Sequence, residues 1–333
     1  MDIRDYLSDD GQAVLALCSA FALPQGAGEQ ACEPFKLSEW NQLARQIQDS
    51  PFQTPAGLQG QASEGLAKGL SVPMDQAERI ARLLDRAGRL ALELEALFAK
   101  GMWAVTRVDE QYPLRLRKSL KHQAPTVLFG AGESRLAQRG GVAIIGSRNI
   151  DEAGVAFAQA VGQKAAAAKL PVVSGGARGS DRLAMGGALE AGGVSVGVLA
   201  DSLERTVRQP DLRQLLLDGQ LALLTPYAPT AGFSVGAAMG RNKIIYGLAE
   251  FGVVVSSDLQ TGGTWAGAVE ALKAGWCPVF VRDAADAPQG NRELLKLGAA
   301  SLPAQELAPI EDLGQWLGEH ARRTPKEQDL FGG

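Results

Sequence analysis

From residue 141 onward, short apolar runs alternate along the chain with longer, alanine-rich segments. Six apolar runs are rich in Val, Ile and Leu, namely GVAIIG, LPVVSG, VSVGVLA, LALLTPY, FGVVVSS and CPVFVRD. Continuous apolar runs of this length are typical of strands that helices cover on both faces. The segments between them have helical composition, at 152–169, 180–191, 211–218, 242–249 and 265–274. This alternation predicts an α/β fold with a doubly wound, mostly parallel sheet.

The first hundred residues follow a different pattern. Apolar residues recur at helical spacing in 5–23, 37–47 and 76–100, and a stretch rich in Gly and Ser separates the last two. We therefore expect a small helical N-terminal domain over 1–100. A bundle of this kind suits docking to a partner or to a DNA backbone, and it suits simple packing equally well.

A basic stretch joins the two patterns. Residues 101–140 predict two short strands, MWAVTR and APTVLFGAG, on either side of the basic segment YPLRLRKSLK. Such a segment is more often a solvated helix face than a ligand site. We assign 101–310 to a second domain that includes this entry segment, and 311–333 to a polar, flexible tail.

Composition narrows the class of protein. A chain of 333 residues with 46% hydrophobic and 21% charged residues is typical of a globular protein with about two domains. Three scattered cysteines and two histidines make a zinc site or a disulfide framework unexpected, and we expect no bound metal. The opening MDIRDYLSDDGQ does not resemble a secretory signal, and no run of about 18 apolar residues follows. We therefore expect a cytoplasmic protein without a membrane partner.

Charge is distributed unevenly. The net charge of −4 argues against a large polycationic surface. Residues 1–100 carry 9 Lys and Arg against 14 Asp and Glu, whereas residues 101–140 carry 7 against 3. A local basic surface is therefore compatible with the acidic total.

Three glycine-rich loops follow predicted strands and should meet at the carboxyl edge of the sheet, where doubly wound folds bind ligands. They are GSRN, SGGARGSD and TGGTWAGA, and in the last of these we expect Thr264 to be a helix N-cap. Glycine allows close approach of the backbone, helix N-termini favour anions, and an arginine fork suits phosphate. We assign a phosphate site to Gly146, Ser147, Arg148, Ser174, Gly175, Gly176, Arg178, Gly179, Asp181, Gly262, Gly263 and Thr264.

A fourth element, MGRNKIIYG, adds Arg241, Asn242 and Lys243 at the expected start of an apolar helix. The cluster could simply cap the helix. Cations are unfavourable at that end of the helix dipole, however, so an anionic ligand gives two of them a reason to be there.

Motifs for covalent chemistry are absent from the sequence. It contains no HExxH, GxxxxGK[ST] or GxGxxG, we recognise no nucleophile elbow of the GxSxG type, and the sequence offers no Cys–His candidate pair. We therefore assign no catalytic residues and no cofactor, and we expect a binding protein rather than an enzyme.

The ordered motifs YPLRL, PTVLFGAG, VAIIGSR, VVSGGARGSD, RNKII, GGTWAGA and GNRELLKLGA resemble the DprA/Smf family of DNA-processing proteins over about 111–302. The resemblance implies an extended Rossmann-like, doubly wound sheet behind a small helical N-terminal domain. It also implies a homodimer that binds single-stranded DNA and helps to load the RecA recombinase. By position, Arg148, the SGGARG loop with Arg178, and the pair Arg241–Asn242 match residues of the family's DNA pocket.

The chain departs from the family pattern at several points. Met185 stands where many relatives have a histidine, and TVRQPD replaces their usual YP-Lys segment, which leaves Arg208 as the nearest cation. The GGTWAGA loop indicates a divergent branch. The pathway therefore stays open between transformation, repair and defence.

Enzymes and sensors of the same superfamily offer an alternative. LOG-like phosphoribohydrolases, which act on nucleoside monophosphates, and SLOG nucleotide sensors have a PGGxGTxxE motif that TGGTWAGAVE partly matches. Here Glu270 falls one residue late and Thr261 replaces the proline. The phosphate pocket is thus expected to be kept and the catalytic carboxylate displaced.

The C-terminal residues Gln328, Asp329, Leu330 and Phe331 give one further hypothesis. Two large apolar residues end a polar stretch, and they either fold back onto the body or anchor another protein. They resemble QxxLF-type peptides that engage the sliding clamp of the replicative polymerase, although Glu327 stands where glutamine is usual.

Overall fold

A computed structural model of the chain describes residues 2–23 and 32–321. The chain divides into two compact units. The first comprises Met1–Tyr112, His122–Ala131 and Pro226–Pro229, and the second comprises Pro113–Lys121, Gly132–Thr225 and Thr230–Gly333. Each unit is considered in turn.

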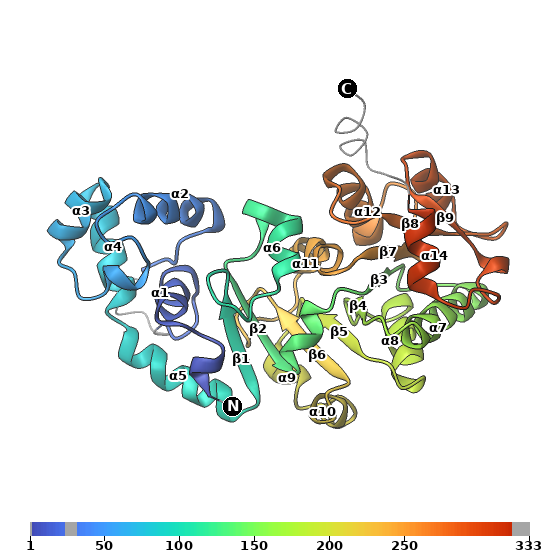
Figure 1. Cartoon of the computed structure of the whole chain (residues 1–333), viewed down its shortest axis with the longest axis horizontal. Coiled ribbons are helices and arrows are strands. Elements are labelled where there is room, and N and C mark those ends of the chain that lie inside the picture. Colours follow the sequence, from blue (N-terminus) through green and yellow to red (C-terminus); the bar gives the residue numbers. More distant parts are fainter. Residues whose placement is uncertain (1, 24–31, 322–333) are drawn as a thin grey trace. The chain divides into compact units, whose positions relative to one another are not determined.

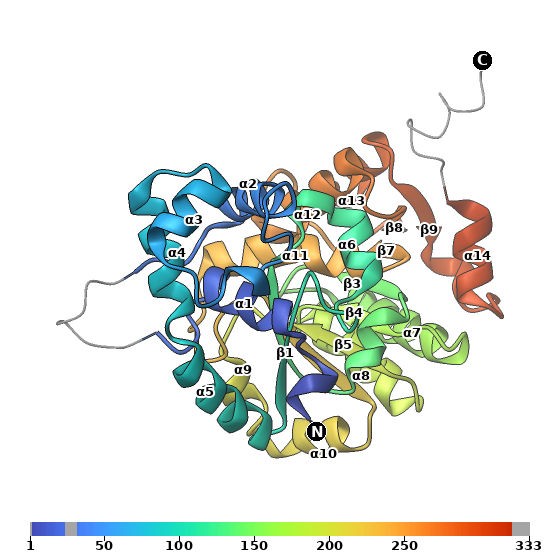
Figure 2. The same cartoon turned by 60° about the vertical axis from the view of Figure 1, so that its left-hand side comes forward.

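The first unit is a helical bundle with an antiparallel strand pair. Its helices are α1 (Asp9–Cys18), α2 (Leu37–Gln48), α3 (Ser63–Leu70), α4 (Met74–Leu84) and α5 (Ala87–Ala99), and its strands are β1 (Met102–Thr106) and β2 (Val127–Gly132). Figure 2 shows the five helices gathered beside β1. Their core consists of fully buried side chains such as Leu15, Leu43, Ile80 and Trp103.

Two features of this unit differ from the sequence-based expectation. The stretch 76–100 forms two helices rather than one, because the chain turns at Asp85 and Arg86. The Arg86 guanidinium donates hydrogen bonds to the carbonyl oxygens of Ala16, Ser19 and Phe21, so it caps the end of α1 instead of lying on a continuous helix. The Gly- and Ser-rich stretch between the expected helices contains α3.

The second unit contains a seven-stranded parallel sheet in the order β6-β5-β4-β3-β7-β8-β9. The strands are β3 (Val142–Ile145), β4 (Val172–Ser174), β5 (Ser195–Val198), β6 (Leu221–Thr225), β7 (Phe251–Val254), β8 (Val279–Asp283) and β9 (Ala300–Pro303). The predicted α/β class and doubly wound parallel sheet are confirmed. The sequence reading missed only β9 of these seven strands, because its ASLP segment is short and only half apolar.

Helices cover both faces of this sheet. They are α6 (Leu114–Leu120), α7 (Glu152–Ala167), α8 (Ser180–Glu190), α9 (Leu203–Thr206), α10 (Pro210–Leu217), α11 (Val235–Leu248), α12 (Gly262–Ala274), α13 (Gln289–Lys296) and α14 (Leu313–His320). Right-handed crossovers run outward from β3 in one direction and from β7 in the other, which places their helices on opposite faces. Figure 1 accordingly shows α11 and α12 above the strands and α7 and α8 below them.

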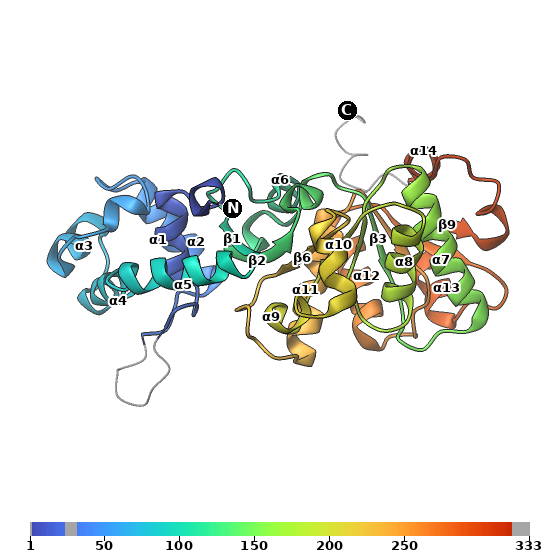
Figure 3. The same cartoon turned by 90° about the horizontal axis from the view of Figure 1, so that it is seen from below.

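Glycines allow α7 and α8 to lie against each other, as Figures 1 and 3 both show. A Cβ atom at Gly162 would collide with the carbonyl oxygen of Ala184, and one at Gly187 would lie 2.5 Å from the carbonyl oxygen of Gln159. Close packing of these two helices fixes the position in space of the first turn of α8. The loop that precedes α8 is thereby held at the carboxyl edge of the sheet.

Short 3-10 helices complete the description: η1 (Ile3–Asp5), η2 (Ala56–Leu58), η3 (Lys121–Gln123), η4 (Ser134–Gln138) and η5 (Ala304–Glu306). The expected tail from residue 311 begins with α14, whose Leu313 and Leu317 are buried. Residues 322–333, with the proposed clamp anchor at 328–331, lie outside the described residues. Within the described residues, every helix is too short or too polar to cross a membrane.

Candidate functional site

The order of the strands reverses between β3 and β7, so the loops that follow β3, β4 and β7 meet where doubly wound sheets hold their ligands. A cavity of about 640 Å³ opens beside this point, over β3 to β6. Its walls come from β5 and β6, from the loops after β3, β4, β5 and β6, and from α8, α9, α10 and α11. A volume of this size is in the usual range for sites that take a small ligand.

Five of the residues predicted from the sequence line this cavity: Arg148, Gly175, Gly176, Arg178 and Arg241. They come from three separate elements, which the fold brings together. The other predicted residues lie behind or beside the lining. Gly146, Ser147, Ser174, Gly179 and Asp181 build the bases of the first two loops, whereas Asn242, Lys243, Gly262, Gly263 and Thr264 are outside the lining.

The loop after β3 is held at its base by the loops after β7 and β4. The Ser147 amide donates to the carbonyl of Ser256, 2.8 Å away, and the Ser180 hydroxyl donates to the carbonyl of Ser147, 3.2 Å away. Gly179 has a φ of +85° and lies so close to the Arg148 carbonyl that a Cβ would collide with it. The exposed Arg148 side chain therefore projects from a backbone that is fixed on both sides.

Asp181 organises the second loop from within. Its buried carboxylate accepts hydrogen bonds from the amides of Gly175, at 3.1 Å, and Ala177, at 3.4 Å. Burial raises the pKa of Asp181 to about 6, although the nearby Arg241 and these amides favour the ionised form. The two amide hydrogen bonds to this carboxylate hold the glycine loop in shape.

Arg241 reaches the cavity from an unexpected position in its helix. The sequence predicted a helix over 242–249 with Arg241 at its head. In the structure α11 already begins at Val235, and its N-cap, Ser234, accepts a hydrogen bond from the Ala237 amide at 3.0 Å. The argument from the helix dipole for Arg241 and Lys243 is therefore wrong, because both lie beyond the first turn. The predicted helix did not include the stretch GFSVGAAMG, but the residues of this stretch from Val235 onward are helical.

The Arg241 side chain nevertheless points to the predicted place. It is 6% exposed, and its guanidinium donates to the carbonyl of Gly175 at 3.1 Å. A Cβ atom at Gly175 would collide with this guanidinium, which explains why the loop has a glycine there. Arg241 and Arg148 thus line one cavity, from α11 and from the loop after β3.

The third loop, TGGTWAGA, does not line the cavity but is bound to α11, which does. The Asn242 side-chain amide donates to the carbonyl of Gly263 at 3.0 Å and so joins α11 to the start of α12. The predicted N-cap at Thr264 is wrong, because α12 already begins at Gly262 and its N-cap is Thr261. The loop's glycines therefore form the first turn of a helix rather than the lining of the cavity.

The cavity residues that the sequence analysis did not assign to the site include Arg182, Asp201 and Phe233. The guanidinium carbon of Arg148 lies 5.6 Å from the centre of the half-exposed Phe233 ring. Arg182 is one helical residue beyond the loop motif, and Asp201 follows β5, a strand whose loop lacks glycine. The position of Asp201 just after a predicted strand was the available signal for that residue.

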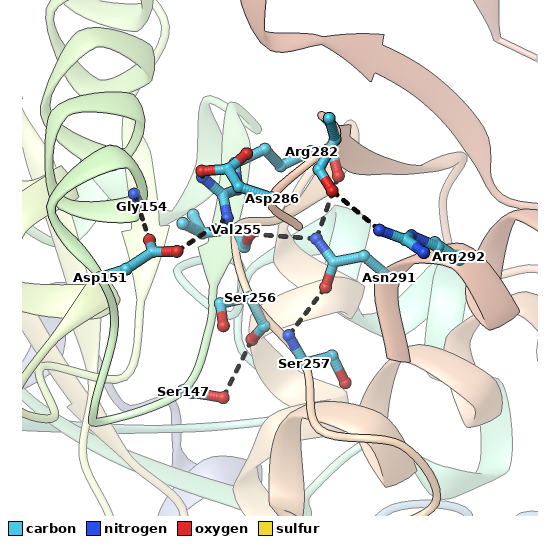
Figure 4. A network of polar contacts seen from close by, with 11 residues as sticks. Ser147, Asp151, Gly154, Val255, Ser256, Ser257, Arg282, Asp286, Asn291 and Arg292 are labelled. Carbon is cyan, nitrogen blue, oxygen red and sulfur yellow. Dashed lines mark hydrogen bonds and ion pairs between the residues drawn. The ribbon is translucent and has the colours of Figure 1, made fainter. Parts of the chain in front are cut away.

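A second polar network occupies the other side of the reversal point, at the carboxyl ends of β7 and β8 (Figure 4). Arg282 is 1% exposed, and its guanidinium lies 3.6 Å from the carboxylates of both Asp151 and Asp286. Asn291 accepts from the Ser257 amide at 2.8 Å and donates to the carbonyls of Val255, at 3.1 Å, and Arg282, at 3.0 Å. None of these network residues lines the cavity, so the network joins strands and loops to one another.

Comparison with known proteins places these observations in a family. Residues 103–312 match the family DNA recombination-mediator protein A. The putative DNA processing protein DprA of Mycobacterium tuberculosis is 29% identical over 264 residues, and the DNA processing protein DprA of Bacillus subtilis is 28% identical over 191 residues. The matches cover 74% and 56% of this chain, and they span 65% and 63% of the length of these curated relatives.

Two solved structures share the fold. DNA processing protein A from Streptococcus pneumoniae superposes with a TM-score of 0.56 and 21% identity, covering 83% of this chain and 98% of that one. DNA processing protein A from Helicobacter pylori, described by its single-stranded DNA binding mode, gives 0.52 and 21%, covering 66% and 97%. At these identities the likeness concerns the fold.

Proposed function

Because the chain belongs to the DNA recombination-mediator protein A family, we propose that it binds single-stranded DNA through the cavity beside β3 and β4. The observation that carries the proposal is the meeting of Arg148, Arg178 and Arg241, from three elements, around one cavity. Arginine forks and exposed loop amides are the groups that hold phosphate. Contacts of this kind fix the position of a strand without reading its sequence.

The shape of the site favours a single strand over a duplex. A cavity of about 640 Å³ admits one nucleotide unit but not a base-paired helix. The half-exposed Phe233 ring beside Arg148 offers a surface on which a base can stack. An unpaired strand can present both a phosphate and a free base to this pair, whereas a duplex keeps its bases stacked on one another.

The position of Glu270 favours binding over catalysis. This carboxylate was the candidate for a phosphoribohydrolase acid, and it lies exposed on α12 and outside the cavity lining. A group that acts on a bound nucleotide must come within hydrogen-bond reach of it. The alternative of a LOG-like enzyme or a SLOG nucleotide sensor therefore rests on the phosphate pocket alone.

Family membership supports three further parts of the proposal. We propose that the chain acts as a cytoplasmic homodimer, that it protects single strands and helps to load RecA, and that it does so in recombination, transformation or defence. The motif at 328–331 adds a proposed contact with the sliding clamp. A titration of the purified clamp with the peptide 323–333, and with its Leu330→Ala/Phe331→Ala version, tests that contact.

Fluorescence anisotropy with a single strand and its duplex tests the main proposal. We expect the single strand to bind more tightly, with a slope of log affinity against log salt of about −0.7 for each phosphate contact. Arg148→Ala should weaken binding, whereas Lys296→Ala, which removes an exposed cation on α13, should not. Equal affinity for both DNA forms, or an unchanged Arg148→Ala protein, contradicts the proposal, and release of free base from a nucleoside monophosphate supports the enzyme instead.

A further inference from the structure

The cavity has opposite charges on its two sides. Arg148, Arg178, Arg182 and Arg241 belong to the loops after β3 and β4, to α8 and to α11. On the other side of the cavity, toward β5 and β6, Asp201 lies in the loop after β5 and Asp211 lies on α10. Since β3, β4, β5 and β6 are neighbours in that order, the cavity runs from a cationic side to an acidic side. A ligand that matches it carries a negative charge at one end and hydrogen-bond donors at the other.

An apolar floor separates the two sides. It is formed by Met185, Leu199 and Leu223, and by Gly197 on β5. A Cβ atom at Gly197 would lie 2.9 Å from Leu223 and 3.5 Å from Met185, so the glycine keeps the backbone close to these side chains. Met185 stands where many relatives are expected to have histidine, which makes this part of the floor apolar. A flat aromatic group such as a nucleobase suits the floor, with its polar edge extending toward Asp201.

The Asp201 carboxylate can accept hydrogen bonds from the polar edge of a base. One carboxylate oxygen accepts from the Ser202 amide at 2.8 Å, and the other pairs with Arg205. The Arg205 side chain is 68% exposed, so this pair is solvated and leaves acceptor positions on the carboxylate for a ligand. An ionised carboxylate only accepts hydrogen bonds, and the base edge opposite it must therefore donate.

We propose that Asp201 makes the cavity prefer bases with an exocyclic amino group over thymine, an inference that rests on the proposed binding of single-stranded DNA. Cytosine, adenine and guanine present an amino group to a carboxylate. The Watson–Crick edge of thymine has one N–H between two carbonyl oxygens, and the carboxylate repels both oxygens. Phosphate binding by the arginines gives affinity for every strand, and Asp201 adds a preference among bases.

Hexamers of 5-methyl-deoxycytidine and of thymidine test this preference in the full chain. The two bases share the 5-methyl group, and they differ in having an amino group or a carbonyl at position 4. We expect the 5-methylcytosine hexamer to bind roughly tenfold more tightly, the lower end of the range for one hydrogen bond to a charged group. Asp201→Asn should bring the two affinities within about twofold, because an amide can donate as well as accept.

Matched controls separate this inference from the proposed function. Asp218→Asn changes an aspartate at the end of α10 that does not line the cavity, and it should leave the tenfold preference intact. Ribocytidine hexamers should gain nothing over deoxycytidine hexamers, and a gain that Asp201→Asn removes would show that the aspartate reads the sugar instead. Equal affinities in the unmodified chain, or a preference unchanged by Asp201→Asn, overturn the inference alone. Failure of both hexamers to bind overturns the proposed function and the inference with it.

Discussion

Two buried arginines lie at the same edge of the parallel sheet, on either side of the point where the strand order reverses. Arg241 lines the cavity, and the carboxylate near it, that of Asp181, is buried and hydrogen-bonded to a glycine loop. Arg282 lies between the half-exposed carboxylates of Asp151 and Asp286 and lines no cavity. Burial of a cation therefore does not by itself identify a binding site. What distinguishes Arg241 is the empty volume beside it and the two exposed arginines, Arg148 and Arg178, that face the same volume.

The largest expected effect is a pH dependence of stability that comes from Asp181, the carboxylate near Arg241. The pKa of Asp181 is about 6 in the folded protein, against an ordinary value of 3.8. The folded state therefore binds more protons than the unfolded state between about pH 4 and pH 6, and the stability contributed by this group falls as pH rises through that window. The change amounts to about 3 kcal/mol at most, and it is complete above the folded pKa.

Comparison with Asp181→Asn isolates this contribution from the other acidic groups. The free energy of unfolding of the native chain minus that of the variant should decline from pH 4 to pH 6 and then stay level. Urea unfolding at several pH values measures it. A difference that rises over the same window contradicts the assignment of the raised pKa to Asp181.

The next largest effect concerns single-strand DNA affinity. It should depend on Arg148, on the cavity side of the reversal point, and not on Arg282, on the other side. Arg148→Ala is expected to cost about 1.5–3 kcal/mol of single-strand binding, because it removes a charge-assisted hydrogen bond. Lysine at this position should restore only part of the loss, since it lacks the planar fork. Arg282→Met should leave the affinity within about twofold. Anisotropy on the three variants checks the contrast, and equal losses for Arg148→Ala and Arg282→Met would remove the distinction.

Substitutions of Arg282 should instead change the free energy of unfolding. Its Nε and Nη2 atoms have no hydrogen-bond partner among the described residues, and both neighbouring carboxylates can be hydrated when it is lost. Methionine has a similar volume and should be almost neutral, as apolar replacements of buried ion pairs often are. Alanine leaves a cavity and should cost about 2 kcal/mol. Denaturant unfolding distinguishes the two, and a methionine variant as unstable as the alanine variant would show that the charge itself matters.

The sequence was informative about the fold and the loops for one physical reason. Apolar runs with fixed spacing specify buried strands, and a glycine-rich loop after such a strand must lie at the carboxyl edge. Arg148 and Arg178 were found because they belong to those loops. The same logic placed Thr264 and the glycines of TGGTWAGA in the lining, but that segment is the first turn of α12.

Other residues depend on how distant segments pack, which local pattern does not contain. Arg241 lies mid-helix because Ser234 caps α11 seven residues earlier, within a segment that the sequence analysis did not assign to a helix. Arg282 is followed by Asp283 in the polar last part of β8, so its burial was not expected from sequence. Phe233 acquires Arg148 as a neighbour only when the loops after β3 and β6 come together, and Asp201 joins the same cavity only when the loop after β5 packs beside them.

The smallest expected effect compares two asparagines, one on each side of the reversal point. Asn242 makes one hydrogen bond, of 3.0 Å, to the carbonyl of Gly263, whereas the fully buried Asn291 makes three, to Ser257 and to two carbonyls. A single neutral hydrogen bond contributes about 1 kcal/mol, and carbonyls left unpaired at a site closed to water add to the loss. Asn242→Ala should therefore lower the free energy of unfolding by about 1 kcal/mol and leave single-strand affinity within about twofold, because its loop lies outside the cavity. Asn291→Ala should cost at least twice as much stability, since it frees three backbone groups together. Urea unfolding with anisotropy on the same samples gives both quantities. A large loss of DNA affinity in Asn242→Ala would bring the start of α12 into the binding site, and it would extend the cationic side of the cavity across the reversal point.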